Sequence, residues 1–194
     1  MLRIGDLSLS RGGQTLLSGL TVDVAPGETL WLTGPNGSGK TTLLLACAGL
    51  VPPDSGTIDW SKPDPVAYSA FQGPERDGLT LGEDLAFWQS LSGDPLGLGD
   101  RLASVGLHDR EATPVTGLSA GQRRRLALAR LLGSGKPAWL MDEPFAGLDT
   151  DGQALVRSAL RDHLERGGIA LIASHQPVAL PGRPARKLVL DIAA

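Results

Sequence analysis

Two stretches near the start of the chain, residues 2–10 and 20–24, alternate apolar and polar side chains, as half-buried β-strands do. Pro26-Gly27 makes a turn into an apolar run at 29–33, which predicts a short buried strand. Residues 57–60 follow a turn rich in proline and glycine and predict another short strand. The first part of the chain is therefore expected to be mainly β-structure.

The rest of the chain mixes further apolar strands with helices. Strands are expected at 66–71, 137–141, 169–173 and 187–192, and helices at 41–49, 80–91, 100–105, 120–132 and from Thr150 to Gly167. Capping boxes open three of these helices, at Thr80-x-x-Glu83, Ser119-x-x-Gln122 and Thr150-x-x-Gln153. We expect one α/β domain over 1–194, with a largely helical subdomain at roughly 73–133 inserted between strands of the core.

The composition is that of an ordinary globular protein, with 194 residues, 41% of them hydrophobic and 20% charged. The net charge of -3 and the aromatic fraction of 4% argue against nucleic acid as a partner. No segment is apolar over the roughly 18 residues that a membrane-spanning helix needs, and polar residues interrupt the start too soon for a signal peptide. We expect a cytosolic location, and the single cysteine, Cys47, is expected to be a core residue rather than a reactive thiol.

The clearest chemical pattern is a phosphate-binding loop between the strand at 29–33 and the helix at 41–49. Glycines let the backbone wrap around phosphate oxygens, and the helix adds the positive end of its dipole. Lys40 can bridge the β- and γ-phosphates of a nucleotide, and the Thr41 hydroxyl can ligate Mg²⁺. The residues expected to touch the nucleotide here are Gly34, Pro35, Asn36, Gly37, Ser38, Gly39, Lys40, Thr41 and Thr42.

A later apolar strand ends in two adjacent acids, Asp142 and Glu143. Asp142 is placed to hold Mg²⁺ through water and to complete the metal site that begins at Thr41. Glu143 points to the opposite side, where a water molecule in line with the γ-phosphate needs a base. Kinases, GTPases and many ATPases share a phosphate loop, so it predicts a fold and a ligand but does not decide the function.

The segment Leu118-Ser-Ala-Gly-Gln122 resembles the signature motif of the ATP-binding-cassette (ABC) ATPases, with Ala120 where glycine is commonest. The other motifs of that family stand in the family's order: the Walker A loop at 34–42, the Q-loop at Gln72, the Walker B strand at 138–143, the D-loop at 146–149 and the switch histidine at His175. The resemblance covers essentially the whole chain. It implies an ABC-type nucleotide-binding domain of the P-loop NTPase class, with a RecA-like core, an N-terminal antiparallel β subdomain and an inserted helical subdomain.

The resemblance also implies that two copies share each nucleotide. Ser119 at a helix N-cap, with the Gly121 amide beside it, forms a second anion site. In the family this motif, which includes Gln122, covers the γ-phosphate held by Lys40 of another subunit. Asp149 is expected to contact the partner near its Walker A loop. The active unit is therefore expected to be a head-to-tail homodimer.

Further roles follow from the same resemblance. His175 is expected to contact the γ-phosphate or the attacking water. Gln72 is expected to contact Mg²⁺ or water and to report the nucleotide state to the helical subdomain. ATP and Mg²⁺ are the expected cofactors, and Lys40, Glu143 and His175 are the expected catalytic residues.

Two features depart from the family or stand outside its motifs. Arg11 occupies the place where family members often stack an aromatic ring on adenine. Its guanidinium can stack on a base, or Arg11-Gly12-Gly13 can form a solvated turn, and the sequence leaves both open. The run Arg123-Arg124-Arg125 spans most of a helix circumference, which favours a mostly solvated face over phosphate or lipid binding.

Four segments, 34–44, 118–130, 139–144 and 174–177, resemble most closely the haem-exporter ATPases of cytochrome c maturation. That resemblance implies hydrolysis linked to haem delivery to a periplasmic chaperone, without direct haem contact. It implies integral-membrane transporter subunits as partners and a peripheral position on the cytoplasmic face of the bacterial inner membrane. The alternatives are the ATPase of another small-substrate ABC transporter, and a soluble ABC ATPase acting on DNA or ribosomes.

A candidate docking surface for the membrane partner lies between Gln72 and the helix at 80–91. Phe87 and Trp88 point to different sides of that helix, so an exposed position for at least one of them is one possibility. A place for both in the local core is equally compatible with the sequence.

Overall fold

The computed structural model describes residues 1–70, 78–92, 96–180, 182 and 184–191. The chain divides into two units, each described by itself. The first unit comprises Met1–Tyr68, Lys136–Glu143 and Leu160–Ala194. The second unit comprises Ser69–Gly135 and Pro144–Ala159.

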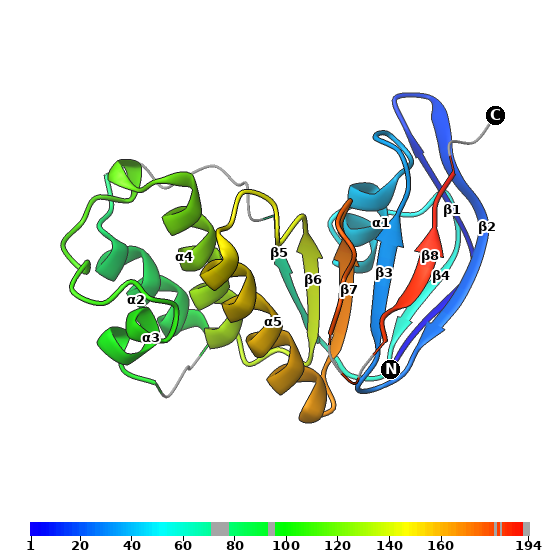
Figure 1. Cartoon of the computed structure of the whole chain (residues 1–194). Coiled ribbons are helices and arrows are strands. Elements are labelled where there is room, and N and C mark those ends of the chain that lie inside the picture. Colours follow the sequence, from blue (N-terminus) through cyan, green and yellow to red (C-terminus); the bar gives the residue numbers. More distant parts are fainter. Residues whose placement is uncertain (71–77, 93–95, 181, 183, 192–194) are drawn as a thin grey trace. The chain divides into compact units, whose positions relative to one another are not determined.

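An antiparallel sheet in the order β2-β1-β4 belongs to the first unit (Figure 1). Its strands are β1 (Leu2–Arg11), β2 (Gln14–Val24) and β4 (Ser55–Trp60). A two-residue hairpin joins β1 to β2, and its Gly12 and Gly13 have φ angles of 60° and 80°. Two consecutive residues at positive φ are what the tightest hairpin turns require, and glycine adopts that conformation without strain.

β2 is longer than the strand expected at 20–24, because it begins at Gln14. The register between β1 and β2 shifts between Leu7 and Leu9, and Gly19 takes a φ of 66°. Such irregularities interrupt the alternation of buried and exposed positions on which the sequence prediction relied. The other expected strands and helices are all present.

The second sheet of the first unit has the order β5-β6-β7-β3-β8. Its strands are β3 (Thr29–Thr33), β5 (Val66–Ser69), β6 (Ala138–Asp142), β7 (Ile169–Ala173) and β8 (Arg186–Val189). β7 pairs in parallel with both β6 and β3, and β3 pairs in parallel with β8. All of β7 is buried, as is typical of the central strands of a parallel sheet.

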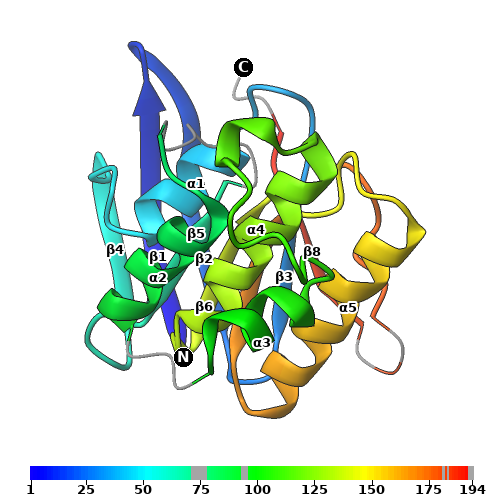
Figure 2. The same cartoon turned by 90° about the vertical axis from the view of Figure 1, so that its left-hand side faces the viewer.

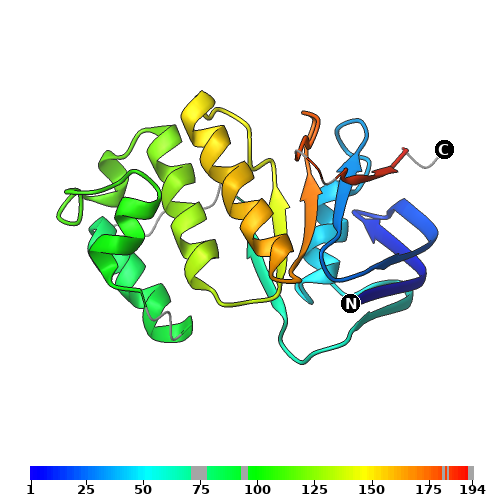
Figure 3. The ribbon, with the colours of Figure 1, turned by 60° about the horizontal axis from the view of Figure 1, so that its bottom comes forward.

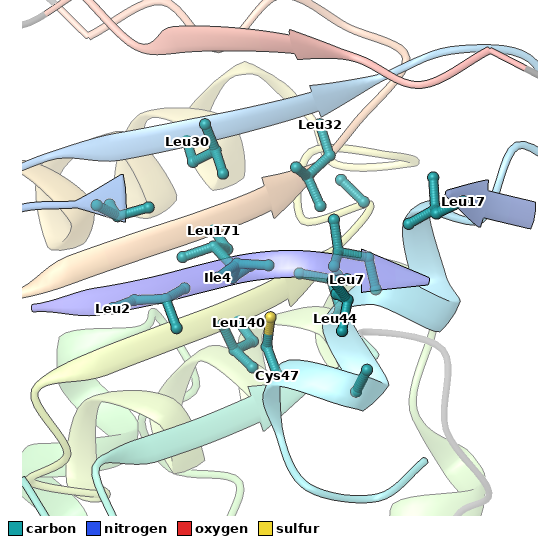
Figure 4. Packing of buried hydrophobic residues seen from close by; sticks show 14 of the residues in the cluster. Leu2, Ile4, Leu7, Leu17, Leu30, Leu32, Leu44, Cys47, Leu140 and Leu171 are labelled. Atoms are coloured by element: carbon teal, nitrogen blue, oxygen red, sulfur yellow. The ribbon is translucent and has the colours of Figure 1, made fainter. Parts of the chain in front are cut away.

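Helix α1 (Lys40–Cys47) packs against β6 and β7, and side chains from both sheets and from α1 meet in one hydrophobic core (Figure 4). Cys47 lies in this core and is 2% exposed. Burial raises the pKa of its thiol to about 12. The expectation that Cys47 is a core residue is confirmed. Among its core neighbours, Figure 4 labels Leu2, Ile4, Leu7, Leu17, Leu30, Leu32, Leu44, Leu140 and Leu171.

Helices make up most of the second unit (Figures 2 and 3). They are α2 (Leu81–Ser92), α3 (Leu98–Ser104), the short 3-10 helix η1 (Val115–Gly117), α4 (Ala120–Gly133) and the first part of α5 (Thr150–Glu165). Helix α4 packs against α2 and α3. The capping boxes expected at Thr80 and Ser119 are both present. The bounds expected for the helical subdomain, roughly 73–133, stay a prediction.

A partly buried ion pair joins α2 to α4. The Asp84 carboxylate is 0% exposed, and its Oδ2 accepts a hydrogen bond from Arg130 Nε at 2.7 Å and lies 2.6 Å from Nη2. A buried carboxylate without its partner is strongly destabilising, so the pair fixes how the two helices meet. Elsewhere on α2, Phe87 and Trp88 are each 39% exposed, so neither is enclosed in the local core.

Helix α5 (Thr150–Glu165) contains residues of both units. The N-cap expected at Thr150 is wrong, because Asp149 Oδ1 accepts a hydrogen bond from the Gly152 amide at 2.8 Å and Thr150 is already helical. Aspartate is among the best N-cap residues, and the Thr-x-x-Gln pattern lies one position too late. The helix ends just before Gly167, where a stop was predicted.

The last turn of α5 carries a buried histidine of the first unit. The His163 ring stacks on Trp139 with centroids 3.9 Å apart, and its Nε2 lies 3.2 Å from the Ile169 carbonyl oxygen. A Cβ on Gly168 would lie only 2.3 Å from this ring, so glycine is needed there. Desolvation lowers the pKa of His163 below its ordinary value of 6.5, and the charge of Arg166 lowers that pKa further.

This environment predicts a loss of stability in mild acid. The folded state disfavours the protonated form of His163, so below pH 6.5 the unfolded state binds more protons than the folded state. The free energy of unfolding therefore falls as the pH drops from 6.5 through the pKa of the folded state. One such group contributes a slope of at most about 1.4 kcal/mol per pH unit. The free energy of unfolding, measured with urea at several pH values from 7 to 5, should change less steeply with pH in His163→Phe than in the wild type.

The control is Leu50→Phe, which adds the same ring at an exposed position without removing a titratable group and should keep the wild-type slope. Equal slopes for His163→Phe and the wild type would contradict the assignment.

Candidate functional site

A group of polar residues in the first unit lies where three parallel strands end. β3 ends at Thr33 and leads into the glycine-rich loop that begins at Gly34, β6 ends at Asp142, and β7 is followed by Ser174. Asp142 of β6 and Leu32 of β3 both pair with Ala173 of β7. The carboxyl ends of neighbouring parallel strands therefore meet at one edge, which is where α/β sheets bind ligands.

The loop from Gly34 to Gly39 wraps tightly because its glycines adopt conformations that other residues avoid. Gly34, Gly37 and Gly39 have φ angles of 147°, 84° and 91°. A Cβ on Gly34 would lie 2.1 Å from the Leu190 carbonyl oxygen and 2.8 Å from Ser38 Oγ. The hydroxyl of Ser38 is buried without a hydrogen-bond partner among the described residues. A concave loop with an unpaired hydroxyl fits an anionic ligand.

Lys40 begins α1 and turns its side chain back over this loop. Its Nζ donates hydrogen bonds to the carbonyl oxygens of Gly34 at 2.9 Å and Pro35 at 2.8 Å, and the residue is 8% exposed. A buried ammonium needs such acceptors. A phosphate oxygen entering the loop would take over this role, so the cation is already where an anion would bind.

Thr41 and Asp142 meet at the neighbouring strand end. The Thr41 hydroxyl donates a hydrogen bond to Asp142 Oδ2 at 2.7 Å. A hydroxyl and a carboxylate are oxygen ligands of the kind that Mg²⁺ prefers, so the pair fits a magnesium site beside a phosphate.

Tyr68 of β5 was not singled out from the sequence. Desolvation raises the pKa of its phenol, and the negative charge of Asp142 raises that pKa further. The sequence signal that could have pointed to Tyr68 is its place near the end of the strand expected at 66–71.

Glu143 and His175 form a third pair at the same edge. Glu143 has a φ of 50°, which is strained for a residue with a side chain, and its amide donates to the Ala173 carbonyl oxygen at 2.8 Å. Its Oε1 accepts from the His175 amide at 3.2 Å and lies 3.7 Å from His175 Nε2. The same Nε2 lies 3.0 Å from Asn36 Oδ1 in the glycine-rich loop, a contact that the sequence did not suggest.

The first unit thus brings most of the expected site residues together: the loop 34–42, Asp142, Glu143 and His175. A cation, a hydroxyl-carboxylate pair and a carboxylate beside a histidine are the elements of metal-assisted phosphoryl transfer. Arg11 belongs to this unit as well, but it is an exposed residue next to the hairpin turn. Gln72 lies outside the described residues.

The other expected site residues, Ser119, Gly121, Gln122 and Asp149, belong to the second unit. Ser119 caps α4 through a complete capping box, in which its amide donates to Gln122 Oε1 at 2.9 Å and its Oγ accepts from the Gln122 amide at 3.2 Å. Gln122 is therefore occupied with the helix end. Ser119 is exposed, so the positive end of α4 is open to a ligand from outside the unit.

The tight approach at Gly34 yields a prediction. In Gly34→Ala the new methyl group would meet the Leu190 carbonyl oxygen, so the loop must shift and the affinity for a nucleoside triphosphate should fall at least about 10-fold. Titration with a fluorescent ATP analogue measures this. Gly49→Ala is the control, because Gly49 has a positive φ of 72° but nothing within 4 Å of the added Cβ. Unchanged affinity of Gly34→Ala would contradict this view of the loop.

Comparison with known proteins gives a consistent family. The model of the ABC transporter family matches residues 17–146. The cytochrome c biogenesis ATP-binding export protein CcmA of Paracoccus denitrificans is 44% identical over 93% of this chain and 85% of its own length. The protein of the same name from Rhodopseudomonas palustris (strain HaA2) is 45% identical over 91% of this chain and 92% of its own length.

Solved structures agree on the fold. An ATP-binding subunit of an ABC transporter superimposes with a TM-score of 0.86 at 23% identity, over 100% of this chain and 88% of that one. An ATP-binding protein of an ABC transporter from Pyrococcus furiosus gives a TM-score of 0.82 at 26% identity, over 97% of this chain and 96% of that one. The expected fold class is confirmed. The chain belongs to the ABC transporter family of ATP-binding proteins and, within it, to the CcmA group of cytochrome c biogenesis ATP-binding export proteins.

Proposed function

We propose that this chain is the ATP-hydrolysing subunit of the ABC transporter of cytochrome c biogenesis, the haem exporter, and that it couples hydrolysis to delivery of haem to a periplasmic chaperone. Membership of the CcmA group supports the assignment to cytochrome c biogenesis. The observation that carries the enzymatic part is the meeting of Lys40, the Thr41–Asp142 pair and the Glu143–His175 pair at one sheet edge.

ATP binds with its phosphates in the loop Gly34–Thr42. The loop amides and the end of α1 surround the β- and γ-phosphates, and Lys40 exchanges its two carbonyl acceptors for phosphate oxygens. Thr41 and Asp142 would hold Mg²⁺, which would neutralise charge on the phosphates, and Gln72, which lies outside the described residues, is the further ligand expected from the sequence. No group of three His, Cys, Asp or Glu residues suited to a metal occurs in the described parts of the chain.

Hydrolysis uses the other pair at this edge. Glu143 is the base that accepts a proton from the attacking water, and its carboxylate is oriented by the His175 amide. The His175 ring, which lies 3.0 Å from Asn36 in the loop, turns to the γ-phosphate or to the water. Arg11 is the candidate for stacking on the adenine ring.

A second copy of the chain completes the site. Ser119 and Gly121, with Gln122 holding the capped end of α4, cover the γ-phosphate bound by the other copy. Asp149 contacts the other copy near its phosphate loop. The N-terminal ends of α1 in one copy and α4 in the other then both face one triphosphate. Positive charge from both sides suits the transition state of phosphoryl transfer, in which negative charge is spread over several oxygens.

The transport path belongs to integral-membrane subunits. None of the helices in the described part of this chain has the length and apolar character to cross a bilayer. The protein sits peripherally at the cytoplasmic face of the inner membrane and does not touch haem itself. Phe87 and Trp88 are each 39% exposed, their rings meet edge to face with centroids 5.7 Å apart, and they form the docking surface on α2.

The shared site yields a prediction about Glu143 and Ser119. Glu143→Gln should bind ATP, lose about 10²–10⁴-fold in turnover and accumulate as an ATP-bound dimer. Adding Ser119→Arg should prevent the dimer through bulk and charge at the α4 end, while each subunit still binds ATP. Sedimentation velocity with ATP and a phosphate-release assay measure both effects.

Ser104→Arg is the matched control, because it adds the same side chain at an exposed position of α3. Wild-type turnover in Glu143→Gln would remove this residue as the base. A dimer that forms equally well with Ser119→Arg would argue against the shared site.

The transporter is tested by affinity purification of the full chain from membranes. Integral-membrane subunits of the cytochrome c maturation system should co-purify, and Trp88→Ser should reduce their yield. Leu50→Ser, at an apolar position that is 64% exposed in the first unit, is the control and should leave the yield unchanged. Recovery of the membrane subunits of a different transporter would support the alternative, an ATPase of another small-substrate ABC transporter.

A further inference from the structure

Three consecutive arginines at the start of α4, Arg123, Arg124 and Arg125, each contact another segment of the second unit. The sequence interpretation of this run as a mostly solvated face is wrong, because each of the three is only partly exposed. Three neighbours on a helix do point in different directions, but arginine is long enough to reach other segments from each of them.

Arg123 reaches back past the start of its own helix. Its Nη1 donates a hydrogen bond to the Leu118 carbonyl oxygen, next to the Ser119 cap. Together with the capping box of Ser119 and Gln122, this contact holds the chain where it enters α4. The signature motif is thus tied to the helix that follows it.

Arg124 lies against the D-loop, residues 146–149. A Cβ on Gly147 would be 2.8 Å from Arg124 Nη1 and 3.1 Å from its Cζ, so the guanidinium fills the space left by the missing side chain. Gly147 also has a φ of 64°, which favours glycine. The Nε of Arg124 is buried and has no hydrogen-bond partner among the described residues. Packing against the loop, and not solvation, therefore determines where this side chain lies.

Arg125 holds the end of the same loop. Its Nη2 lies 3.1 Å from Asp149 Oδ1 and 3.4 Å from Oδ2, and its Nη1 donates to the Val105 carbonyl oxygen at 3.4 Å. The hydrogen bond from the Gly152 amide lowers the pKa of Asp149, and Arg125 lowers that pKa further. A Cβ on Gly106 would lie 2.6 Å from Arg125 Nη1, so this glycine makes room for the guanidinium.

We infer that Arg124 and Arg125 are positioning residues that lock the D-loop onto the first turns of α4, so that the signature motif and Asp149 meet a second copy of this chain as one preformed surface. The inference rests on the proposed shared site. The Asp149 side chain is 68% exposed, and exposed ion pairs add little to folding stability. The contacts therefore act mainly through pre-organisation, because a loop that is already ordered loses less entropy when the second copy binds.

The test measures dimerisation in the Glu143→Gln background with saturating ATP, by sedimentation equilibrium. Arg124→Ala and Arg125→Ala should each raise the dimer dissociation constant about 10-fold, and the double variant should raise it further. ATP affinity of the single subunit, measured with Ser119→Arg added to prevent pairing, should stay within about twofold. Arg110→Ala removes an exposed arginine of the same unit and should leave both quantities unchanged.

Two further variants keep the test independent of folding defects. Arg125→Lys retains a charge that can reach Asp149 but loses the planar fork, so it should restore part of the lost affinity. Gly147→Ala pushes on Arg124 without removing any charge and should weaken the dimer as Arg124→Ala does.

The outcomes separate the two proposals. If Glu143→Gln alone forms no dimer with ATP, the shared site itself fails, and the inference fails with it. If Glu143→Gln dimerises and both arginine variants dimerise as tightly as their parent, the shared site stands and the positioning role is overturned. A fall in single-subunit ATP affinity equal to the loss of dimer would likewise overturn it, because the arginines would then act on the nucleotide and not on the partner surface.

Discussion

The parallel pairing of β3, β7 and β6 is the constraint on which the nucleotide site of the first unit depends. It sets the ends of three strands from distant parts of the chain at one edge, with Leu32 and Asp142 both opposite Ala173. A slip of one residue would turn every side chain of a strand to the other face. The Thr41–Asp142 hydrogen bond and the Glu143–His175 contact would both be lost, although no residue had changed.

The charged groups at this edge are paired with other groups of the chain. The Lys40 ammonium has two carbonyl oxygens, Asp142 has the Thr41 hydroxyl, and Glu143 has the His175 amide. Leaving any of them buried and unpaired would be costly, so each of these charged groups needs a partner, and that need makes them suited to a phosphate or a metal ion as well. In the proposed function a phosphate and a metal ion would replace these hydrogen bonds with similar ones.

Local patterns were enough to predict most strands and helices, the glycine loop and the acids at the end of β6. They succeed because each depends on a few neighbouring residues: a cap, a turn or an apolar run. The close approach of Leu190 to Gly34, and the contact of Asn36 with His175, join residues far apart in the chain. No local pattern encodes such contacts.

The starts of two elements were also misplaced. The start of β2 was missed because bulges in the β1–β2 register hid the alternation of apolar and polar residues. The N-cap of α5 was placed one residue late, at Thr150 instead of Asp149.

The arginine run shows a different limit of pattern reading. Helical periodicity assigns a direction to each Cα–Cβ bond, but it does not say where a side chain of arginine's length ends. At two of the three positions the structure pairs an arginine with a glycine whose Cβ would collide with the guanidinium, Gly147 with Arg124 and Gly106 with Arg125. Both glycines have a positive φ, so the need for a tight turn would by itself explain why glycine stands at these two positions. The contacts show that these glycines also leave space for the two guanidinium groups. A run of charged residues on a helix next to glycine turns can therefore be packed against those turns and need not form a solvated face.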